Sequence, residues 1–402
     1  MILKKEVPFS LKDINAEWLT MALREGGVLG DEQVTGFTHT IIGEETGFLG
    51  EIAILTLEYS SKDVDAPKTM VLKIPTALKN RRLGQLMGAY EKEIRFYRDL
   101  KPTLKIRSPM HYYSALNAVD DPRVILERLK NLNRLPLWAV AIITIIITWI
   151  VGLTPRRYVL LIEDVSHHRL GDQLAGCSET DVKAALDAMA KLHAQFWGSD
   201  ELEDMPWIAP VDISSKIMQL MFLQSIGKFT KANKDHLTER QVRLIDWLKA
   251  NGIELTEKLG SQPRTLLHGD FRLDNLCFDD KRNEVLIFDW QTMLVGSAGM
   301  ELAYFLSAAL PLETTEEKTD EMIEYYRQGL LKLGVEISPA RLRWQYEAGM
   351  LSMVHKIAPI LFQEQLEMGK DRGPEVMQGW IDKIFRKLER VEFERILDEI
   401  PA

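Results

Sequence analysis

Apolar and polar residues alternate with a period of about two along the first part of the chain. The segments VTGFTHTII (34–42), EIAILTLEYS (51–60) and TMVLKIP (69–75) are rich in β-branched residues, and turn-forming stretches such as SKDVDAPK separate them. This pattern is typical of strands that bury one face. We therefore expect a small antiparallel sheet in the N-terminal part of the chain.

Helical spacing follows in RLGQLMGAYEKEIRFYRDL (82–100), which ends before Pro102. The run RYVLLIEDV (157–165) is apolar and of strand length. From Ser178 onward amphipathic helix patterns dominate, over 178–197, 214–260 and 376–398. The order predicts an α+β chain of two lobes. The N-terminal lobe would span 1–165, with an apolar insert at about 131–155, and the C-terminal lobe 166–402.

Composition excludes several classes of protein. The 402 residues carry a net charge of -9, which argues against nucleic-acid partners because phosphate binding needs clustered Lys and Arg. Cys177 and Cys277 lie far apart without CxxC spacing, so neither a disulfide framework nor a zinc site is indicated. No secretory signal pattern is present at the start, and we expect a cytoplasmic location.

The stretch LLHGDFRLDNLCFD (266–279) carries the strongest chemical signal. His268, Asp270 and Asn275 form H-G-D-x-x-x-x-N, the spacing of the H-R-D-x-x-x-x-N catalytic loop of protein kinases. A hairpin pattern follows, LCF then DDKRNE then VLIF, and it returns the chain to Asp289 near Asn275, where the two side chains could share magnesium. The alternative is that these aspartates only cap a turn and end a strand.

HGDFRLDNL followed by VLIFDWQ resembles the aminoglycoside phosphotransferase and choline kinase superfamily, including its ecdysteroid-kinase-like branch. The resemblance implies a protein-kinase-like fold with a small N-terminal antiparallel sheet plus helix and a larger, mostly helical C-terminal lobe. It also implies ATP and Mg²⁺ as cofactors. In that family the residue matching Asp270 is the proposed base, those matching Asn275 and Asp289 bind magnesium, and the histidine matching His268 supports the loop.

The resemblance requires the N-terminal half to bind the nucleotide. Gly43, Gly47 and Gly50 in GEETGFLGE lie between strand patterns, where glycine permits close approach of the backbone to phosphates, although an ordinary hairpin turn has the same composition. YVLLIEDV resembles the hinge between the lobes. Backbone groups from Glu163 to Val165 would meet adenine there.

Lys73 in VLKIP is placed like the phosphate-pairing lysine of V-A-I-K in kinases. A lysine within an apolar strand is costly unless it is paired, so a carboxylate partner is expected. Glu93 in YEKEIRFY is the preferred partner, and Glu91 is the alternative.

Only a short segment separates Asp289 from the next helix pattern, so a small hydroxyl compound is a better acceptor than a peptide. That helix start, MELAYFL, resembles the family's aspartate-led start, but Glu301 replaces the aspartate. His193 in AKLHAQFW is interpreted as a packed structural histidine. Several aromatic residues could form a wall for a cation or a flat apolar substrate, or could equally pack in the core: Trp290, Tyr304, Trp344 and Tyr346. Choline, an aminoglycoside, a macrolide, a sterol and a sugar all remain open as acceptors.

The insert LPLWAVAIITIIITWIVGL (135–153) has no charged residue. Its length meets the threshold of about 20 residues for a membrane-spanning helix. A single crossing would put Lys73 and Asp270 on opposite sides of the bilayer, where one ATP could not reach both. The remaining hypotheses are a helix or helical hairpin at the inner membrane surface, an oligomer contact, or a helix covered by the C-terminal half.

These patterns favour an ATP- and Mg²⁺-dependent small-molecule kinase that phosphorylates a hydroxyl group. The alternative is a catalytically inactive kinase fold that serves as a binding module at a membrane or an apolar partner. Inactive versions usually lose the lysine, the base or the metal ligands, and all of these are present here.

Overall fold

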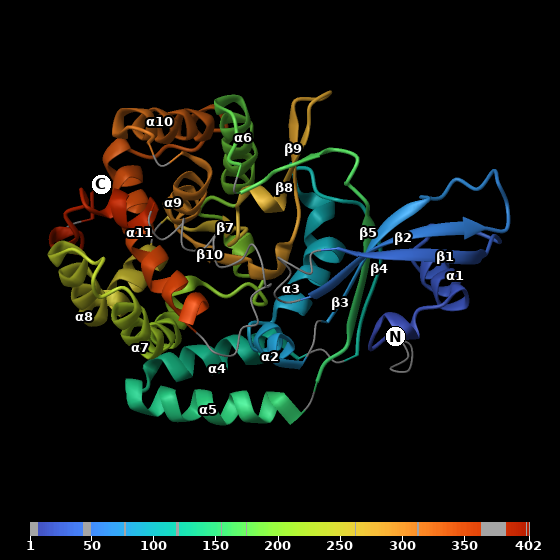
Figure 1. Cartoon of the computed structure of the whole chain (residues 1–402), viewed down its shortest axis with the longest axis horizontal. Helices are drawn as coiled ribbons and strands as arrows, with labels where there is room; N and C mark the ends of the chain where they lie inside the picture. Colours follow the sequence, from blue (N-terminus) through green and yellow to red (C-terminus); the bar gives the residue numbers. More distant parts are fainter. Residues whose placement is uncertain are drawn as a thin grey trace.

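The computed structural model describes residues 7–42, 50–75, 78–117, 120–153, 155–173, 175–261, 263–311, 313–362, 383–398 and 400–401. Figure 1 shows a sheet-containing lobe formed by the N-terminal part (blue) and a larger, mostly helical lobe that ends in red. The bilobal α+β architecture expected from the sequence is confirmed.

Within the described residues, five antiparallel strands form the N-terminal sheet in the order β1-β2-β3-β5-β4. Alternate strand residues such as Leu55 and Leu72 share a buried cluster with Leu19 and Leu23 of helix α1 (Ala16–Glu25). The strands predicted from alternation are confirmed, whereas β4 was not predicted. The strands are β1 (Val34–Ile42), β2 (Gly50–Tyr59), β3 (Thr69–Pro75), β4 (His111–Leu116) and β5 (Tyr158–Glu163).

The predicted helix at 82–100 is interrupted. Helix α2 (Leu78–Leu86) ends before Gly88, whose φ of 64° is left-handed, and α3 (Ala89–Arg95) begins after it. A π-helical turn at Phe96–Leu100 then continues the chain. The expectation of one continuous helix was wrong because a left-handed residue cannot continue a right-handed helix.

The apolar insert forms a helical hairpin between β4 and β5. It consists of α4 (Pro122–Arg134) and α5 (Leu137–Leu153), and α5 packs on α2 and on α7 (Ser215–Ala232), as the lower part of Figure 1 shows. The Lys216 ammonium donates to the Leu135 carbonyl at 2.6 Å. The insert therefore contacts both lobes. Across the described ranges, no helix has the length and apolarity that a bilayer crossing requires.

The C-terminal lobe is built mainly from helices packed around one hydrophobic core. The helical pattern predicted over 214–260 is divided near Asn233, where α7 ends and a turn precedes α8. Of the helix predicted at 376–398, residues 376–382 lie outside the described part and 383–388 are helical. The other helices are α6 (Glu179–Gln195), α8 (Glu239–Ser261), α9 (Ala298–Ala309), α10 (Glu316–Lys332) and α11 (Pro339–Phe362).

Short strands at the junction of the lobes hold the HGD motif. β7 (Thr265–Leu267) leads into the motif and pairs with β10 (Leu294–Gly296). β8 (Leu276–Asp279) follows the motif and forms the predicted hairpin with β9 (Glu284–Ile287), while β6 (Arg169–Leu170) pairs with β8 on its other side. Both ends of the motif are thus fixed by sheet hydrogen bonds.

Candidate active site

The loop from His268 to Asn275 depends on a glycine that no other residue could replace without strain. Gly269 has a φ of 83°, and a Cβ there would lie 2.1 Å from the Thr292 carbonyl oxygen. The neighbouring His268 ring is fully buried, and its Nε2 lies 3.0 Å from the Phe288 carbonyl oxygen. His268 therefore joins the loop to the end of the β8-β9 hairpin, as expected for a supporting residue.

Glu301, near the start of α9, anchors the same loop. Its carboxylate accepts hydrogen bonds from the backbone N–H groups of His268 at 3.1 Å and Gly269 at 2.7 Å, and it lies 3.0 Å from the Nε2 atom of His193. Burial disfavours the ionised carboxylate and so raises the pKa of Glu301. The hydrogen bond to His193 and the other polar contacts outweigh burial, so the pKa of Glu301 lies below its usual value. The other ring nitrogen of His193 lies 2.6 Å from the Tyr326 hydroxyl. Glu301 thus fixes the loop, and His193 is a buried structural residue.

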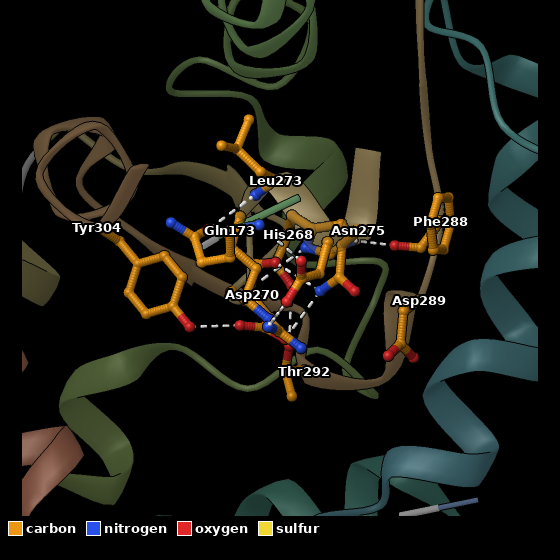
Figure 2. A network of polar contacts seen from close by, with 12 residues as sticks. Gln173, His268, Asp270, Leu273, Asn275, Phe288, Asp289, Thr292 and Tyr304 are labelled. Carbon is orange, nitrogen blue, oxygen red and sulfur yellow. Dashed lines mark hydrogen bonds and ion pairs between the residues drawn. The ribbon is translucent and has the colours of Figure 1, made fainter. Parts of the chain in front are cut away.

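Asp270 lies at the centre of a polar network (Figure 2). Asn275 donates its side-chain N–H to one carboxylate oxygen at 2.8 Å, and the Tyr304 hydroxyl donates to the other. Arg272 Nε lies 3.3 Å from the same oxygen that Asn275 contacts. Burial raises the pKa of Asp270, but the Arg272 charge and the Tyr304 hydrogen bond outweigh it, and the pKa lies below its usual value. Asp270 is therefore an ionised carboxylate held in one orientation.

The β8-β9 hairpin brings Asp289 next to Asn275. Leu276 pairs with Ile287 across the hairpin, and the Phe288 N–H donates to the Asn275 carbonyl at 3.1 Å. Asp289 itself has a left-handed backbone, with φ 66° and ψ 63°, which aspartate tolerates better than most residues. This bend turns the chain sharply after the strand and places the Asp289 side chain at the junction of the lobes (Figure 2).

Lys73 of β3 reaches across that junction. Its ammonium lies 2.5 Å from the Glu93 carboxylate and 3.0 Å from that of Asp289. Gln291 donates to the other oxygen of Glu93 at 2.9 Å. Burial disfavours the charged lysine, yet Asp289 and Glu93 outweigh it and raise the pKa of Lys73, so it stays protonated. The preferred partner Glu93 is confirmed, while the alternative, Glu91, pairs with Arg95 instead.

The glycine-rich stretch falls largely outside the described residues, which exclude Gly43 and Gly47. Gly50 is the first residue of β2, where a Cβ would lie 2.9 Å from the Tyr158 hydroxyl oxygen. Gly50 therefore allows close packing against β5. Phosphate binding by this stretch stays a prediction.

The expected hinge leads from β5 to the β8-β9 hairpin. The Glu163 N–H donates to the Met110 carbonyl at 2.8 Å, and its carboxylate accepts from the Met110 N–H at 3.0 Å. Val165 is buried against Cys277 and Leu286 of the hairpin. This segment therefore links the two lobes, and its contact with adenine stays a prediction.

Most of the suggested aromatic wall is core. Trp290 is fully buried and stacks on Phe96 with ring centroids 3.9 Å apart, and Trp344 and Tyr346 are buried in the C-terminal lobe. Tyr304 differs because its hydroxyl contacts Asp270. The wall interpretation thus fails for all but this residue.

Two lysines near the site, Lys356 and Lys92, carry no mark in the sequence pattern. Lys356 of α11 donates to the Gly269 carbonyl at 2.7 Å and lies 5.0 Å from the Tyr304 ring centroid. Burial lowers the pKa of Lys356. Burial and the nearby charge of Lys356 also lower the pKa of Lys92, on α3, to about 8. Lys356 therefore places an amine against the backbone of the loop, near Asp270.

The side-chain oxygens near the loop suit a hard cation that also binds ligands from outside the protein. Among the described residues, no cluster of three or more His, Cys, Asp or Glu is arranged to hold a metal. Magnesium, however, commonly takes one or two protein oxygens and completes its shell with phosphates and water. Asn275 and Asp289 offer such oxygens, and the Asp289 side chain is one-third exposed. These residues fit magnesium delivered with a nucleotide.

The sequence pattern of the ecdysteroid kinase-like family matches residues 44–336, which is more than half of the chain. The chain belongs to the ecdysteroid kinase-like family. The matched region of this family member runs from the glycine-rich stretch to the end of α10, so it includes Lys73, Asp270 and Asp289.

Curated relatives match only a small part of the chain. The mouse protein acyl-CoA dehydrogenase family member 10 is 35% identical over 107 residues, which cover 23% of this chain and 9% of the relative. The Arabidopsis thaliana protein named probable acyl-CoA dehydrogenase IBR3 is 34% identical over 76 residues, 19% of this chain and 9% of the relative. The match thus spans less than a tenth of either relative.

A solved structure matches the whole chain at the level of fold. The choline kinase of Cryptosporidium parvum Iowa II superposes with a TM-score of 0.50 at 11% sequence identity, covering 98% of both chains. At this identity the likeness concerns the fold alone. The fold is therefore the bilobal, protein-kinase-like one that the motifs suggested.

Proposed function

We propose that this chain is an ATP- and Mg²⁺-dependent phosphotransferase that moves the γ-phosphoryl group to a hydroxyl of a small molecule. The observation that carries the proposal is the meeting of Lys73 and Asp289 at 3.0 Å, 216 residues apart in the chain. It joins the strand that would hold the nucleotide phosphates to the hairpin that ends beside Asn275 and Asp270.

In this proposal the front lobe holds the phosphates. Lys73 stays charged because of its acidic neighbours, and Glu93 orients it. Asn275 and Asp289 would hold magnesium, which neutralises charge on the β- and γ-phosphates when it is bound. Catalysis by such a site consists mostly of placement and charge compensation.

Asp270 would receive the proton of the acceptor. Asn275 and Tyr304 each donate a hydrogen bond to one of its two carboxylate oxygens, so the carboxylate keeps a fixed orientation. The acceptor oxygen would form a bond to the γ-phosphorus as the bond from that phosphorus to the bridging oxygen breaks. The hydroxyl proton passes to Asp270, and ADP leaves with the electron pair of the broken bond.

The short path after Asp289 supports a small acceptor. Trp290–Thr292 form one 3-10 turn, β10 follows, and α9 already begins at Ala298. Protein kinases use a longer segment at this point to bind peptides. Acceptor identity is best found by screening hydroxylated metabolites and antibiotics for ADP release.

Two carboxylate deletions test the proposal. Asp289→Ala should lose Mg²⁺-dependent stabilisation by ATP in a thermal-shift assay, because it removes a proposed magnesium ligand. Asp270→Ala should keep that stabilisation and lose phosphoryl transfer. Asp280→Ala removes an exposed carboxylate that pairs with Arg169 and should change neither property.

The outcomes separate the kinase from an inactive binding module. Transfer that persists in Asp270→Ala would show that another group accepts the proton. Absence of Mg²⁺-dependent ATP stabilisation in the wild-type chain would favour the inactive module instead.

A further inference from the structure

Helix α5 exposes a long apolar face. No Asp, Glu, Lys or Arg occurs in its 17 residues. Its most exposed large side chains are Trp138 (69%), Trp149 (67%), Ile145 (65%), Leu153 (62%) and Ile142 (52%). Large apolar residues at such exposure are ordinarily scattered singly over a surface. Here they lie on one helix.

These side chains form one stripe, named here the α5 face. At about 100° per residue, Trp138 and Trp149 differ by only about 20° in direction, and the other members lie within about 80° of Trp138. Val140 points the opposite way, at about 200°, and is fully buried. The side of α5 that contacts α2 and α7 is thus opposite the exposed α5 face, and α5 itself lies at the lower edge of the molecule in Figure 1.

The size of this surface exceeds that of ordinary apolar patches. Together with Ile146, which lies about 80° from Trp138 and is 50% exposed, these side chains give roughly 750 Å² of apolar surface, taking about 180 to 250 Å² for each full side chain. The largest patch on a typical monomer measures about 300–600 Å². The α5 face therefore has the dimensions of a binding surface.

The charge around the α5 face is opposite to that of the whole chain. Residues 120–157 contain six Lys and Arg against three Asp and Glu, a net charge of +3, while the chain carries -9. Arg123, Arg128 and Arg134 of α4 are exposed, and Arg156 follows α5. Cations beside an apolar helix favour a partner that is apolar inside and anionic at its surface.

We propose that the α5 face docks this protein on a membrane surface that contains anionic lipids. Helix α5 would lie in the plane of the interface, with Trp138 and Trp149 at the level of the headgroups, where tryptophan is enriched. The cations of the hairpin would contact lipid phosphates. A second copy of the chain suits the surface less well, because two like-charged hairpins would then face each other.

Vesicle co-sedimentation of the full chain tests this assignment. The assay compares vesicles of phosphatidylcholine alone with vesicles that also contain phosphatidylserine, at low and high salt. The wild-type chain should bind the anionic vesicles, and salt should weaken the binding. Ile145→Glu combined with Trp149→Glu should reduce the partition coefficient about tenfold or more, because both positions are exposed and their charges would enter the interface.

The matched control combines Leu331→Glu with Leu333→Glu. These residues are 41% and 47% exposed at the end of α10, on the opposite side of the molecule (Figure 1), so the same change in charge should leave binding intact. If the control variant also loses vesicle binding, the change in net charge alone explains the loss, and the assignment to the α5 face is wrong. Equal binding to both kinds of vesicle would remove the role of anionic lipid.

Light scattering on a sizing column tests whether a second copy of the chain binds the α5 face instead of a membrane. The wild-type chain should run as a monomer without lipid. A dimer that the Ile145→Glu, Trp149→Glu variant dissociates, together with no vesicle binding, would show that a second copy occupies the face. Far-UV circular dichroism of the variant should match that of the wild type, so that loss of binding reports on the surface.

Discussion

Replacing Lys73 with methionine should destabilise the fold strongly, apart from any effect on catalysis. The change keeps the side-chain volume but leaves Glu93, which is fully buried, without its cation. At 2.5 Å and an effective dielectric constant of about 20, the lost attraction is about 7 kcal/mol. Desolvation of both ions already offsets part of it in the wild type. We therefore expect a measured loss of about 3–5 kcal/mol in the free energy of unfolding.

The pH dependence of this loss follows from Glu93. Burial raises the pKa of Glu93, and Lys73 opposes that rise, so the variant should have a still higher pKa. A carboxyl whose folded-state pKa is raised stabilises the fold when it is protonated, and this contribution is lost as pH rises through the folded pKa. The penalty should therefore be full at pH 8 and smaller at pH 5.

Urea unfolding followed by circular dichroism measures this loss. The double variant Lys73→Met, Glu93→Gln should recover most of the stability, because no unpaired charge remains. Lys249→Met, which removes an exposed ion pair with Asp246, should leave the midpoint nearly unchanged. If the double variant is as unstable as the single one, or if the loss is independent of pH, the unpaired carboxylate is not its cause.

Three further changes test the loop. Tyr304→Phe removes a hydrogen bond that lowers the pKa of Asp270, so kcat/KM should fall about tenfold or more and its acidic limb should move to higher pH; an unchanged pH profile would contradict this. Gly269→Ala should cost about 1–3 kcal/mol in urea unfolding, since its Cβ meets the Thr292 carbonyl. Glu301→Gln should cost about 2 kcal/mol, and because the pKa of Glu301 is lowered, that difference should shrink below about pH 4, where the carboxyl becomes protonated. A difference that is constant with pH would exclude the carboxylate as the anchor.

The parts of the site that are local in sequence could be predicted. The spacing of Asp270 and Asn275 fixes one turn, and a hairpin must return its second strand to its first, so Asp289 could be placed near Asn275 from the pattern alone. Lys73 could be placed because a lysine in an apolar strand needs a partner. Their catalytic roles stay predictions.

The parts that depend on distant packing could not be predicted. Lys356 reaches the loop from 87 residues beyond Gly269, and an isolated lysine in a helix pattern carries no mark of that contact. Tyr304 looked like any other core aromatic residue. The break at Gly88 was hidden because apolar spacing continues through it, although a glycine within a helical pattern could have warned of a boundary.

The position of α5 between the lobes has a mechanical consequence. It contacts α2 of the N-terminal lobe and α7 of the C-terminal lobe, so any change in the angle between the lobes must shear at least one of these contacts. A membrane or other partner bound to the α5 face that holds the helix in one place would then favour one angle between the lobes. Thermodynamic reciprocity requires that a nucleotide whose affinity depends on this angle would alter the affinity of that partner by the same factor.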